Sequence, residues 1–74
     1  MDKTIPHRSL ILALEAAGSQ SALGRIVGKT QQGVSYWLKA GSPLSGDDCV
    51  RVEKATGVSR RVLRPDLFEE GANQ

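Results

Sequence analysis

Apolar residues recur at spacings of three and four along most of this chain, which is the period of an amphipathic helix. The first such stretch runs from about His7 to Ala17, and a second, shorter one follows Ser19. Gly18 and Gly28 are placed to end these stretches, and Ser19 is placed to cap the second. The apolar positions concerned are Leu10, Ile11, Ala13, Leu14, Ala17, Ala22, Leu23, Ile26 and Val27. Two short helices are therefore predicted.

A third helix is predicted from Thr30 to Lys39. The Thr30 hydroxyl can cap it by accepting a hydrogen bond from the backbone N–H of Gln32 or Gly33. Helical spacing turns one set of side chains towards the core, namely Val34, Trp37 and Leu38. It turns another set largely outward, namely Gln31, Gln32, Ser35 and Lys39. The segment Gly41-Ser42-Pro43 breaks the helix.

Two more helical segments complete the pattern. Ser45 and Asp48 resemble the carboxylate form of a capping box, and they open a fourth helix that Gly57 is placed to end. Ser59 caps a short fifth turn that Pro65 stops, and its inward positions are Val62 and Leu63. Val50 and Val52 alternate with Arg51 as in a strand, but they lie between helical signals. The chain is predicted to be all-α with five short helices.

The 74 residues form one small domain, because they leave no room for a second core. Its ordered part is expected at about 7–68, after a loose arm at 1–6 and before a disordered tail at 69–74. The lone Cys49 excludes an intramolecular disulfide and a multi-cysteine zinc site, so it is interpreted as a small buried apolar residue. No ligand set surrounds His7, and Asp47 and Asp48 are interpreted as carboxylates that favour the helix dipole. No metal or cofactor is expected.

The charge is distributed unevenly, although the net charge is only +2. Residues 1–64 carry ten basic and five acidic side chains, whereas residues 65–74 carry three acidic ones. A basic body with an acidic tail fits a domain that binds a polyanion, but an ordinary mixed surface would look similar. No apolar run approaches the ~20 residues of a membrane span, and no secretory signal is present. A cytoplasmic protein without membrane contact is expected.

Residues 20–39 carry the most specific pattern, because helix, sharp turn and helix follow one another as in a helix-turn-helix. Gly24 costs about 1 kcal/mol relative to alanine in mid-helix, which indicates that another backbone, expected to be that of the following helix, comes close. Gly28 supplies the left-handed bend. Gly33 would allow close approach to the preceding helix or to DNA.

The exposed polar residues of this segment suit DNA. Gln31 and Gln32 each carry an amide that can donate and accept together, which matches the N6/N7 edge of adenine in the major groove. Helix N-termini and capping groups suit phosphate contacts, which favours roles for Gln20 and Thr30. Lys29 and Lys39 flank the third helix where phosphates would pass. The motif core comprises Leu23, Gly28, Val34 and Trp37.

On these residues the segment resembles the helix-turn-helix of the phage repressor and Cro superfamily. The whole of residues 8–68 is similar, more narrowly, to small all-helical Cro-like regulators and YdaS-type antitoxins of prophages. The matching segments are Gly18 to Leu23, Gln31 to Trp37, Ala55-Thr56-Gly57 and the closing Leu63-Arg64-Pro65-Asp66-Leu67-Phe68. The chain departs from the family at Gly24, where alanine is usual. It departs again at residues 41–44, where a more basic linker is common.

The resemblance implies a lambda-repressor-like domain whose recognition helix spans about residues 30–39. It implies that the residues facing the major groove are Gln31, Gln32, Ser35 and Tyr36. It further implies that Gln20, Thr30 and Lys39 anchor phosphates, and that Val34 and Trp37 lock the two helices together. From the residues alone, Tyr36 packs at the helix edge or contacts DNA. Arg25 is either solvated or bound to phosphate. The cluster of Arg60, Arg61 and Arg64 either pairs with Glu53 and the acidic tail or forms a second basic surface.

The sequence thus predicts a DNA-binding transcriptional regulator, a prophage or toxin–antitoxin repressor that blocks polymerase on bacterial DNA. One recognition helix reads few base pairs, so a homodimer or higher oligomer is expected on an operator. Its candidate contacts are Val62, Leu67 and Phe68. The alternative is an antitoxin-like or adaptor protein that acts mainly through a protein partner. An enzyme is not expected, because no nucleophile–base pair, metal cluster or phosphate loop stands at a usable spacing.

Overall fold

Five helices make up the described part of the chain, residues 5–68 of the computed structural model. They are α1 (Arg8–Ala17), α2 (Gln20–Val27), α3 (Gln31–Ala40), α4 (Gly46–Thr56) and α5 (Arg60–Leu63). No strand occurs within these residues, so the all-α prediction is confirmed. The tail predicted at 69–74 and most of the arm predicted at 1–6 lie outside the described residues.

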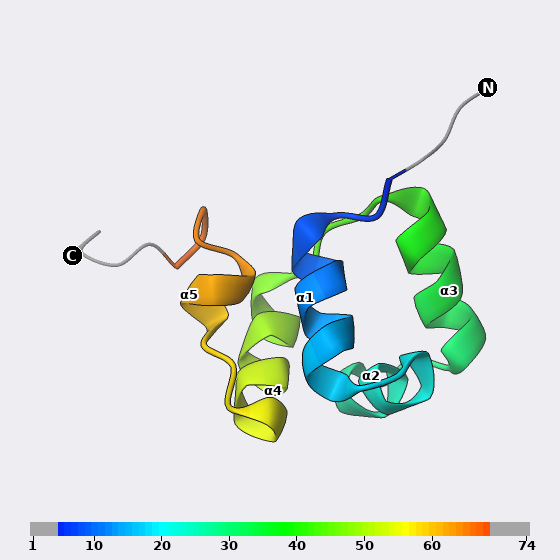
Figure 1. The fold of residues 1–74 in the computed structure, drawn as a ribbon, viewed down its shortest axis with the longest axis horizontal. Coiled ribbons are helices and arrows are strands. Elements are labelled where there is room, and N and C mark those ends of the chain that lie inside the picture. The colour runs from blue at the N-terminus through cyan, green and yellow to red at the C-terminus, as the bar shows by residue number, and fades with distance from the viewer. Residues whose placement is uncertain (1–4, 69–74) are drawn as a thin grey trace.

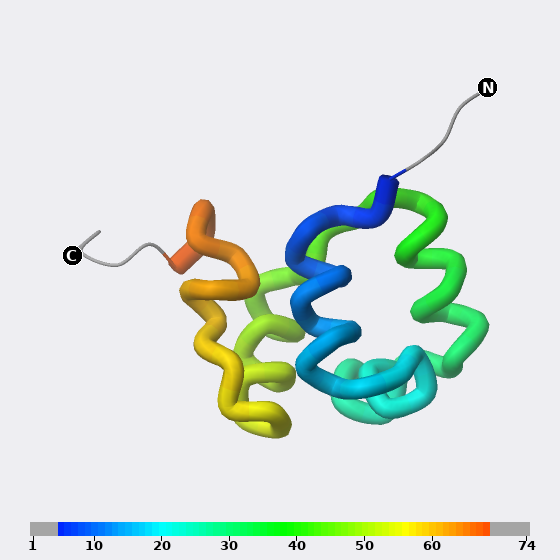
Figure 2. The backbone as a smooth tube through the Cα atoms, viewed as in Figure 1, coloured from blue at the N-terminus to red at the C-terminus, as the bar shows by residue number. Residues whose placement is uncertain are grey.

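The helices are arranged around α1 and α4, which pack side by side at the centre (Figure 1). The α2 helix lies at the lower end of α1, on the side of α3 (Figure 1), is bent by 102° from α1, and contacts α1, α3 and α4. The α3 helix stands at one end of the molecule and packs mainly on α2, while α5 packs on α1 and α4 at the opposite end (Figure 2). The two ends that sequence analysis assigned to DNA and to dimer contacts are therefore far apart.

The predicted helix boundaries are confirmed by their capping bonds. The hydroxyls of Ser19, Thr30, Ser45 and Ser59 accept from the backbone N–H groups of Ala22, Gly33, Asp48 and Arg61 at 3.0–3.2 Å. Four glycines with positive φ end the first four helices, namely Gly18, Gly28, Gly41 and Gly57. One predicted detail is wrong. The Asp48 carboxylate does not complete a capping box but pairs with Arg51 at 2.7 Å.

The core is formed by side chains from every helix and from the α3–α4 linker. Its fully buried members are Leu10, Ala13, Leu23, Val34, Leu44, Cys49, Val52 and Leu63. Burial raises the pKa of the Cys49 thiol, and this agrees with the apolar role predicted for it. Val62, predicted to point inward, is instead half exposed, because the single turn of α5 can bury only one side and Leu63 occupies it.

The turn between α2 and α3 comes so close to α2 that Gly24 has no room for a side chain. A Cβ atom at Gly24 would lie 2.4 Å from the Lys29 carbonyl oxygen. The Lys29 N–H also donates to the Gly24 carbonyl at 2.7 Å, so both backbones are fixed together. The predicted close approach is confirmed, but the backbone concerned is the turn rather than α3. Gly33 likewise faces the turn, since the nearest atom to a Cβ there is Thr30 Oγ1 at 3.3 Å.

Replacing Gly24 with alanine should destabilise the fold, because the Lys29 carbonyl would have to move away from α2. Overpacking of this kind costs about 1–3 kcal/mol, which outweighs the gain of about 1 kcal/mol in helix propensity. Urea denaturation followed by circular dichroism should show a lower unfolding midpoint for Gly24→Ala. Gly46→Ala is the matched control, because its Cβ would meet only side chains at 3.6 and 3.7 Å. Equal midpoints for both variants would contradict the steric argument.

The Arg64 side chain connects the turn that follows α5 to the α3–α4 linker by hydrogen bonds. The Arg64 guanidinium donates to both carboxylate oxygens of Asp66, at 2.9 and 2.6 Å, and to the Leu44 carbonyl at 2.7 Å. The backbone N–H groups of Leu67 and Phe68 both donate to the Arg64 carbonyl at 3.0 Å. We call residues 63–68, held in this way, the C-terminal clasp. Sequence analysis singled out these residues as a motif without a physical role.

The ion pair in the clasp should make stability depend on pH in the acid range. The hydrogen bonds from Arg64 lower the pKa of Asp66 to about 2, from an ordinary value of 3.8. The ionised carboxylate therefore stabilises the fold above pH 4, and that contribution is lost as the pH falls from about 4 to about 2. Melting temperatures across this range should fall for the wild type and fall less for Asp66→Asn. Parallel curves for the two proteins would exclude this contribution.

Candidate DNA-binding surface

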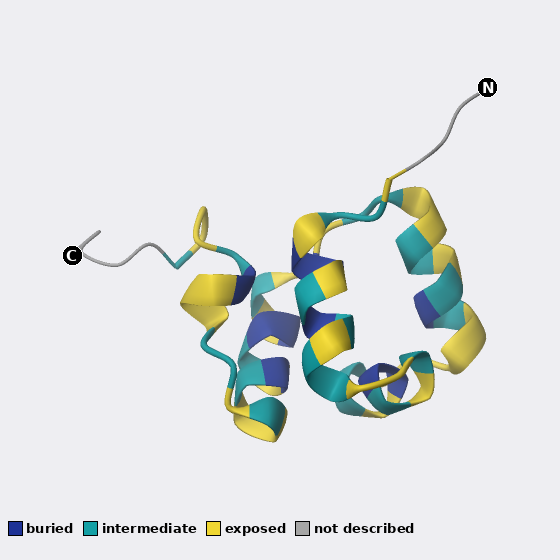
Figure 3. Cartoon of the chain, in the orientation of Figure 1, coloured by how far each residue is buried: buried dark blue, intermediate teal, exposed yellow. Residues whose placement is uncertain are grey.

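Two faces of α3 carry different kinds of side chain, as its helical spacing predicts. Val34 is fully buried, and Trp37 and Leu38 pack against the core from the same side. Gln31, Gln32 and Lys39 are exposed on the outer side, and Ser35 lies half-buried beside them. Figure 3 shows the exposed positions along the edge of α3 that faces away from α1. The helix thus offers a polar strip about two turns long to a ligand.

Tyr36 belongs to the outer face. Its side chain is 74% exposed, which makes it one of the most exposed large hydrophobic side chains in the described residues. Little of the ring is therefore packed against the protein, and contact with DNA stays a prediction. A phenol ring in this position is available to a ligand through both its face and its hydroxyl group.

The turn between α2 and α3 sets the direction in which the outer face points. Gly28 adopts the left-handed conformation at φ 76°, and the Thr30 hydroxyl caps α3 through the Gly33 N–H at 3.0 Å. Leu23 on α2 and Val34 on α3 are both fully buried in the shared core. The turn and these two side chains together fix the crossing of the helices, so the first turn of α3 is presented rigidly.

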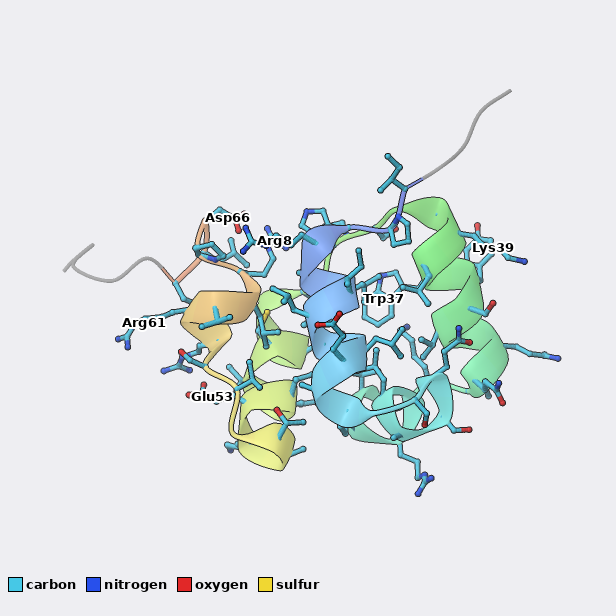
Figure 4. The ribbon with its side chains drawn as sticks, viewed as in Figure 1. Arg8, Trp37, Lys39, Glu53, Arg61 and Asp66 are labelled. Atoms are coloured by element: carbon cyan, nitrogen blue, oxygen red, sulfur yellow. The ribbon has the colours of Figure 1, made fainter. Side chains whose placement is uncertain are left out.

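The four residues proposed for phosphate contact come from the start of α2, the α2–α3 turn and the end of α3. Gln20 starts α2 and is half-buried, whereas Lys29, Thr30 and Lys39 are exposed. Lys39 extends away from the body of the protein at the C-terminal end of α3 (Figure 4). Arg25 is exposed near the end of α2 and makes no ion pair among the described residues. Basic and hydrogen-bonding groups thus lie at both ends of α3.

Lys29 also makes a contact that sequence analysis did not anticipate. Its ammonium nitrogen lies over the indole ring of Trp37, 5.0 Å from the ring centroid. Gly33 lies next to this contact, because a Cβ there would be in ordinary van der Waals contact with the Lys29 Cβ atom, at 3.6 Å. The sequence signal for the contact is a lysine and a tryptophan eight positions apart on either side of the first turns of α3. This cation is held close to α3 before any ligand arrives.

Loss of the Lys29 charge should weaken the fold slightly. A cation over an exposed aromatic face contributes about 0.5–1 kcal/mol, so Lys29→Gln should lower the free energy of unfolding by about that amount. Lys39→Gln removes the same charge from the same helix region without an aromatic partner, and it should cost less. Urea denaturation monitored by the fluorescence of Trp37, the only tryptophan, measures both. Equal losses in the two variants would show that the contact contributes nothing.

The second arginine cluster is largely neutralised by acidic partners. Arg60 lies 3.5 Å from Glu53, and Arg64 is bound to Asp66. The predicted pairing is therefore confirmed for these two arginines. Arg61 is exposed and points away from the protein, without an ion pair among the described residues (Figure 4). This end of the molecule offers much less free positive charge to a polyanion than the number of its arginines suggests.

The three candidate dimer contacts also lie at the α5 end. Val62 and Leu67 are 51% and 50% exposed. Phe68 is half-buried against the core, with the Arg60 guanidinium 5.3 Å from its ring centroid. Its buried side serves the fold, so only part of the ring is available to a second molecule.

Within 5–68, no three His, Cys, Asp or Glu side chains are grouped closely enough to hold a metal ion. No single helix there is long and apolar enough to cross a membrane, and α1 and α2 meet the length and composition test only as a sharply bent pair.

Comparison with known proteins identifies the family of this chain. The sequence model of the family described as "Bacterial toxin YdaS" matches residues 10–71, which include the helix-turn-helix and the C-terminal clasp. The chain belongs to the YdaS family. It is 35% identical over 57 residues to the Escherichia coli (strain K12) protein named "Putative transcriptional regulator YdaS". That match covers 74% of this chain but only 58% of the relative's length. No solved structure matches the chain.

Proposed function

We propose that this YdaS-family chain binds a specific sequence in double-stranded DNA and acts as a transcriptional repressor. The observation that carries the proposal is the outer face of α3, where Gln31, Gln32 and Tyr36 are exposed while Val34 on the opposite face is buried. The similarity to a protein named as a transcriptional regulator supports the same function. The protein works by occupying DNA in the bacterial cytoplasm rather than by catalysis, and bound protein blocks polymerase.

In this proposal the first turn of α3 reads bases in the major groove. The amides of Gln31 and Gln32 each donate to and accept from an adenine edge, and Ser35 and Tyr36 contact neighbouring bases. Gln20 and Thr30, together with Lys29 and Lys39, hold phosphates on either side of the groove. Such contacts fix the register of the helix, while the glutamines discriminate between sequences.

A dimer follows from the small number of bases that one α3 helix can reach. Two copies related by a two-fold axis would read half-sites about 34 Å apart, or a multiple of this. The α5 end suits the dimer contact, because Val62 and Leu67 are exposed there and α3 lies at the opposite end, free for DNA. Sedimentation velocity with operator-length DNA tests this. A single copy on DNA, and a monomer at tens of micromolar without it, would exclude the dimer.

Replacing either glutamine with alanine should relax the preference for one base pair. The expected cost is about 1–3 kcal/mol at that position, with little change on unrelated DNA, because the phosphate contacts remain. Selection of binding sites from random DNA, followed by gel shifts on the selected site and its single-base variants, measures this preference. If Gln31→Ala and Gln32→Ala both retained the wild-type preference, the groove-facing assignment would be wrong.

Replacing Lys39 with alanine should weaken binding to all sequences alike. Removal of one phosphate contact releases about one counterion fewer, so the slope of log K against log salt should become shallower by about one. Lys54→Ala is the matched control, because Lys54 is an exposed lysine on α4, away from the α3 face. A slope that changes equally in both variants would indicate a general charge effect instead of a phosphate contact.

The alternative function is that of a protein that acts mainly through another protein. Two observations favour it: the family description names a toxin, and the α5 end exposes Val62 and Leu67. Expression of the wild type and of a Gln31→Ala, Gln32→Ala double variant in bacteria separates the alternatives. If growth inhibition depends on DNA binding, the double variant should relieve it. Inhibition that persists in the double variant and disappears on Leu67→Asp would favour a protein partner.

A further inference from the structure

We propose that Arg64 is a positioning residue for the recognition helix and acts on α3 through the backbone of Leu44. The inference concerns how α3 is held in place, and only its consequence for DNA rests on the proposed function. It assigns a physical role to the C-terminal clasp, which lies at the end of the molecule opposite to the groove-facing residues.

The α3 helix is supported along its inner face by Val34, Trp37 and Leu38, which pack into the core. It packs mainly on α2, and its N-terminal end is fixed by the tight turn at Gly28. Its C-terminal end leads through Gly41 into the linker of residues 41–45, which joins it to α4. Within this linker only Leu44 is buried. Leu44 therefore anchors the linker into which the C-terminal end of α3 leads.

Leu44 is held at three points by three different parts of the chain. Its side chain is fully buried in the core. Its N–H donates to the Ser9 hydroxyl of α1 at 2.8 Å, and its carbonyl accepts from Arg64 Nη1 at 2.7 Å. Ser9 Oγ is in turn 2.8 Å from His7 Nδ1. The backbone N–H and C=O groups of Leu44 are thus hydrogen-bonded to side chains from α1 and from the clasp, respectively.

The Arg64 guanidinium is itself held in place within the clasp. Asp66 accepts two hydrogen bonds from Arg64, which leaves the Arg64 side chain only 13% exposed. Leu67 and Phe68 lie over Gly46, the first residue of α4, so that a Cβ there would be 3.6–3.7 Å from them. Only a planar group with several donors can serve Asp66 and the Leu44 carbonyl together. A lysine at position 64 could therefore not fully replace the guanidinium.

Loss of Arg64 would leave the Leu44 carbonyl without its partner in a half-buried site. The linker would then shift to expose that oxygen to water, because an unpaired buried acceptor is costly. The C-terminal end of α3 would shift with the linker, because Gly41 joins the two directly. Small displacements of a binding helix are enough to weaken its contacts.

The experiment compares Arg64→Gln and Asp66→Asn with Arg61→Gln in the full chain. Arg61→Gln is the matched control, because it removes the same charge three residues before Arg64. The Arg61 side chain is exposed. Circular dichroism first establishes that each variant is folded at the temperature used. Amide and Trp37 indole N–H resonances of the free proteins then report the position of α3. Finally, gel shifts measure affinity for a site selected with the wild type.

Arg64→Gln should move the resonances of residues 34–44 and lower DNA affinity about tenfold, which corresponds to one lost buried hydrogen bond. Arg61→Gln should leave both near wild-type values. Asp66→Asn keeps the bond to Leu44 but loosens the guanidinium, so it should give smaller changes at the same resonances. This milder variant decides the question if Arg64→Gln does not fold. Resonances of α3 that are unmoved in the folded Arg64 and Asp66 variants would overturn the proposal.

The two proposals fail in different ways. If the wild type selects no DNA sequence, the proposed function is wrong, while shifted α3 resonances in Arg64→Gln would still support the positioning role. If the wild type binds DNA and Arg64→Gln binds equally well with unmoved resonances, the positioning role is wrong and the proposed function stands. A loss of affinity equal to that of Arg61→Gln would indicate a charge effect and would also overturn the positioning role.

Discussion

The close contact between the Lys29 carbonyl and Gly24 is the constraint on which the rest of the structure depends. It brings the α2–α3 turn against α2, so that α3 can leave at a steep angle after a single left-handed residue. The inward face of α3 then reaches the core, where Val34 joins Leu23. Without this approach, α3 could still form but could not place Val34 in the core. The outer face of α3 owes its direction to a backbone contact made in the turn that precedes the helix.

Local sequence signals were sufficient to predict most of the fold. Helix starts and ends depend on residues one to four positions apart, and the hydroxyl caps at Ser19 and Thr30 occur where the pattern placed them. His7 is an informative exception, because its ring nitrogen rather than a hydroxyl accepts from the Ser9 N–H at 3.1 Å. The prediction for Val62 was wrong because α5 is a single turn. Four residues give too little periodicity to distinguish buried from exposed positions.

The parts of the site that sequence analysis missed are contacts between residues distant in the chain. Arg64 and Leu44 are 20 positions apart, and Ser9 and Leu44 are 35 apart. No periodicity connects such pairs, because each depends on how α1 and the C-terminal clasp meet the linker in space. The Lys29–Trp37 contact was missed for another reason. Sequence analysis assigned Trp37 to the core and Lys29 to phosphate. The half-buried indole of Trp37 instead contacts both the core and the Lys29 ammonium group.

The anchoring of the linker through backbone atoms has a consequence for how the sequence of such a protein can evolve. Val34 is held by the core, while the linker is held by the N–H and C=O of Leu44 and not by any polar group on the outer face of α3. Substitutions at Gln31, Gln32 or Ser35 therefore leave the supporting contacts intact. The proposed recognition residues and the scaffold are separate sets of side chains. If the proposed function is right, binding preference can change by single substitutions that leave these supporting contacts in place.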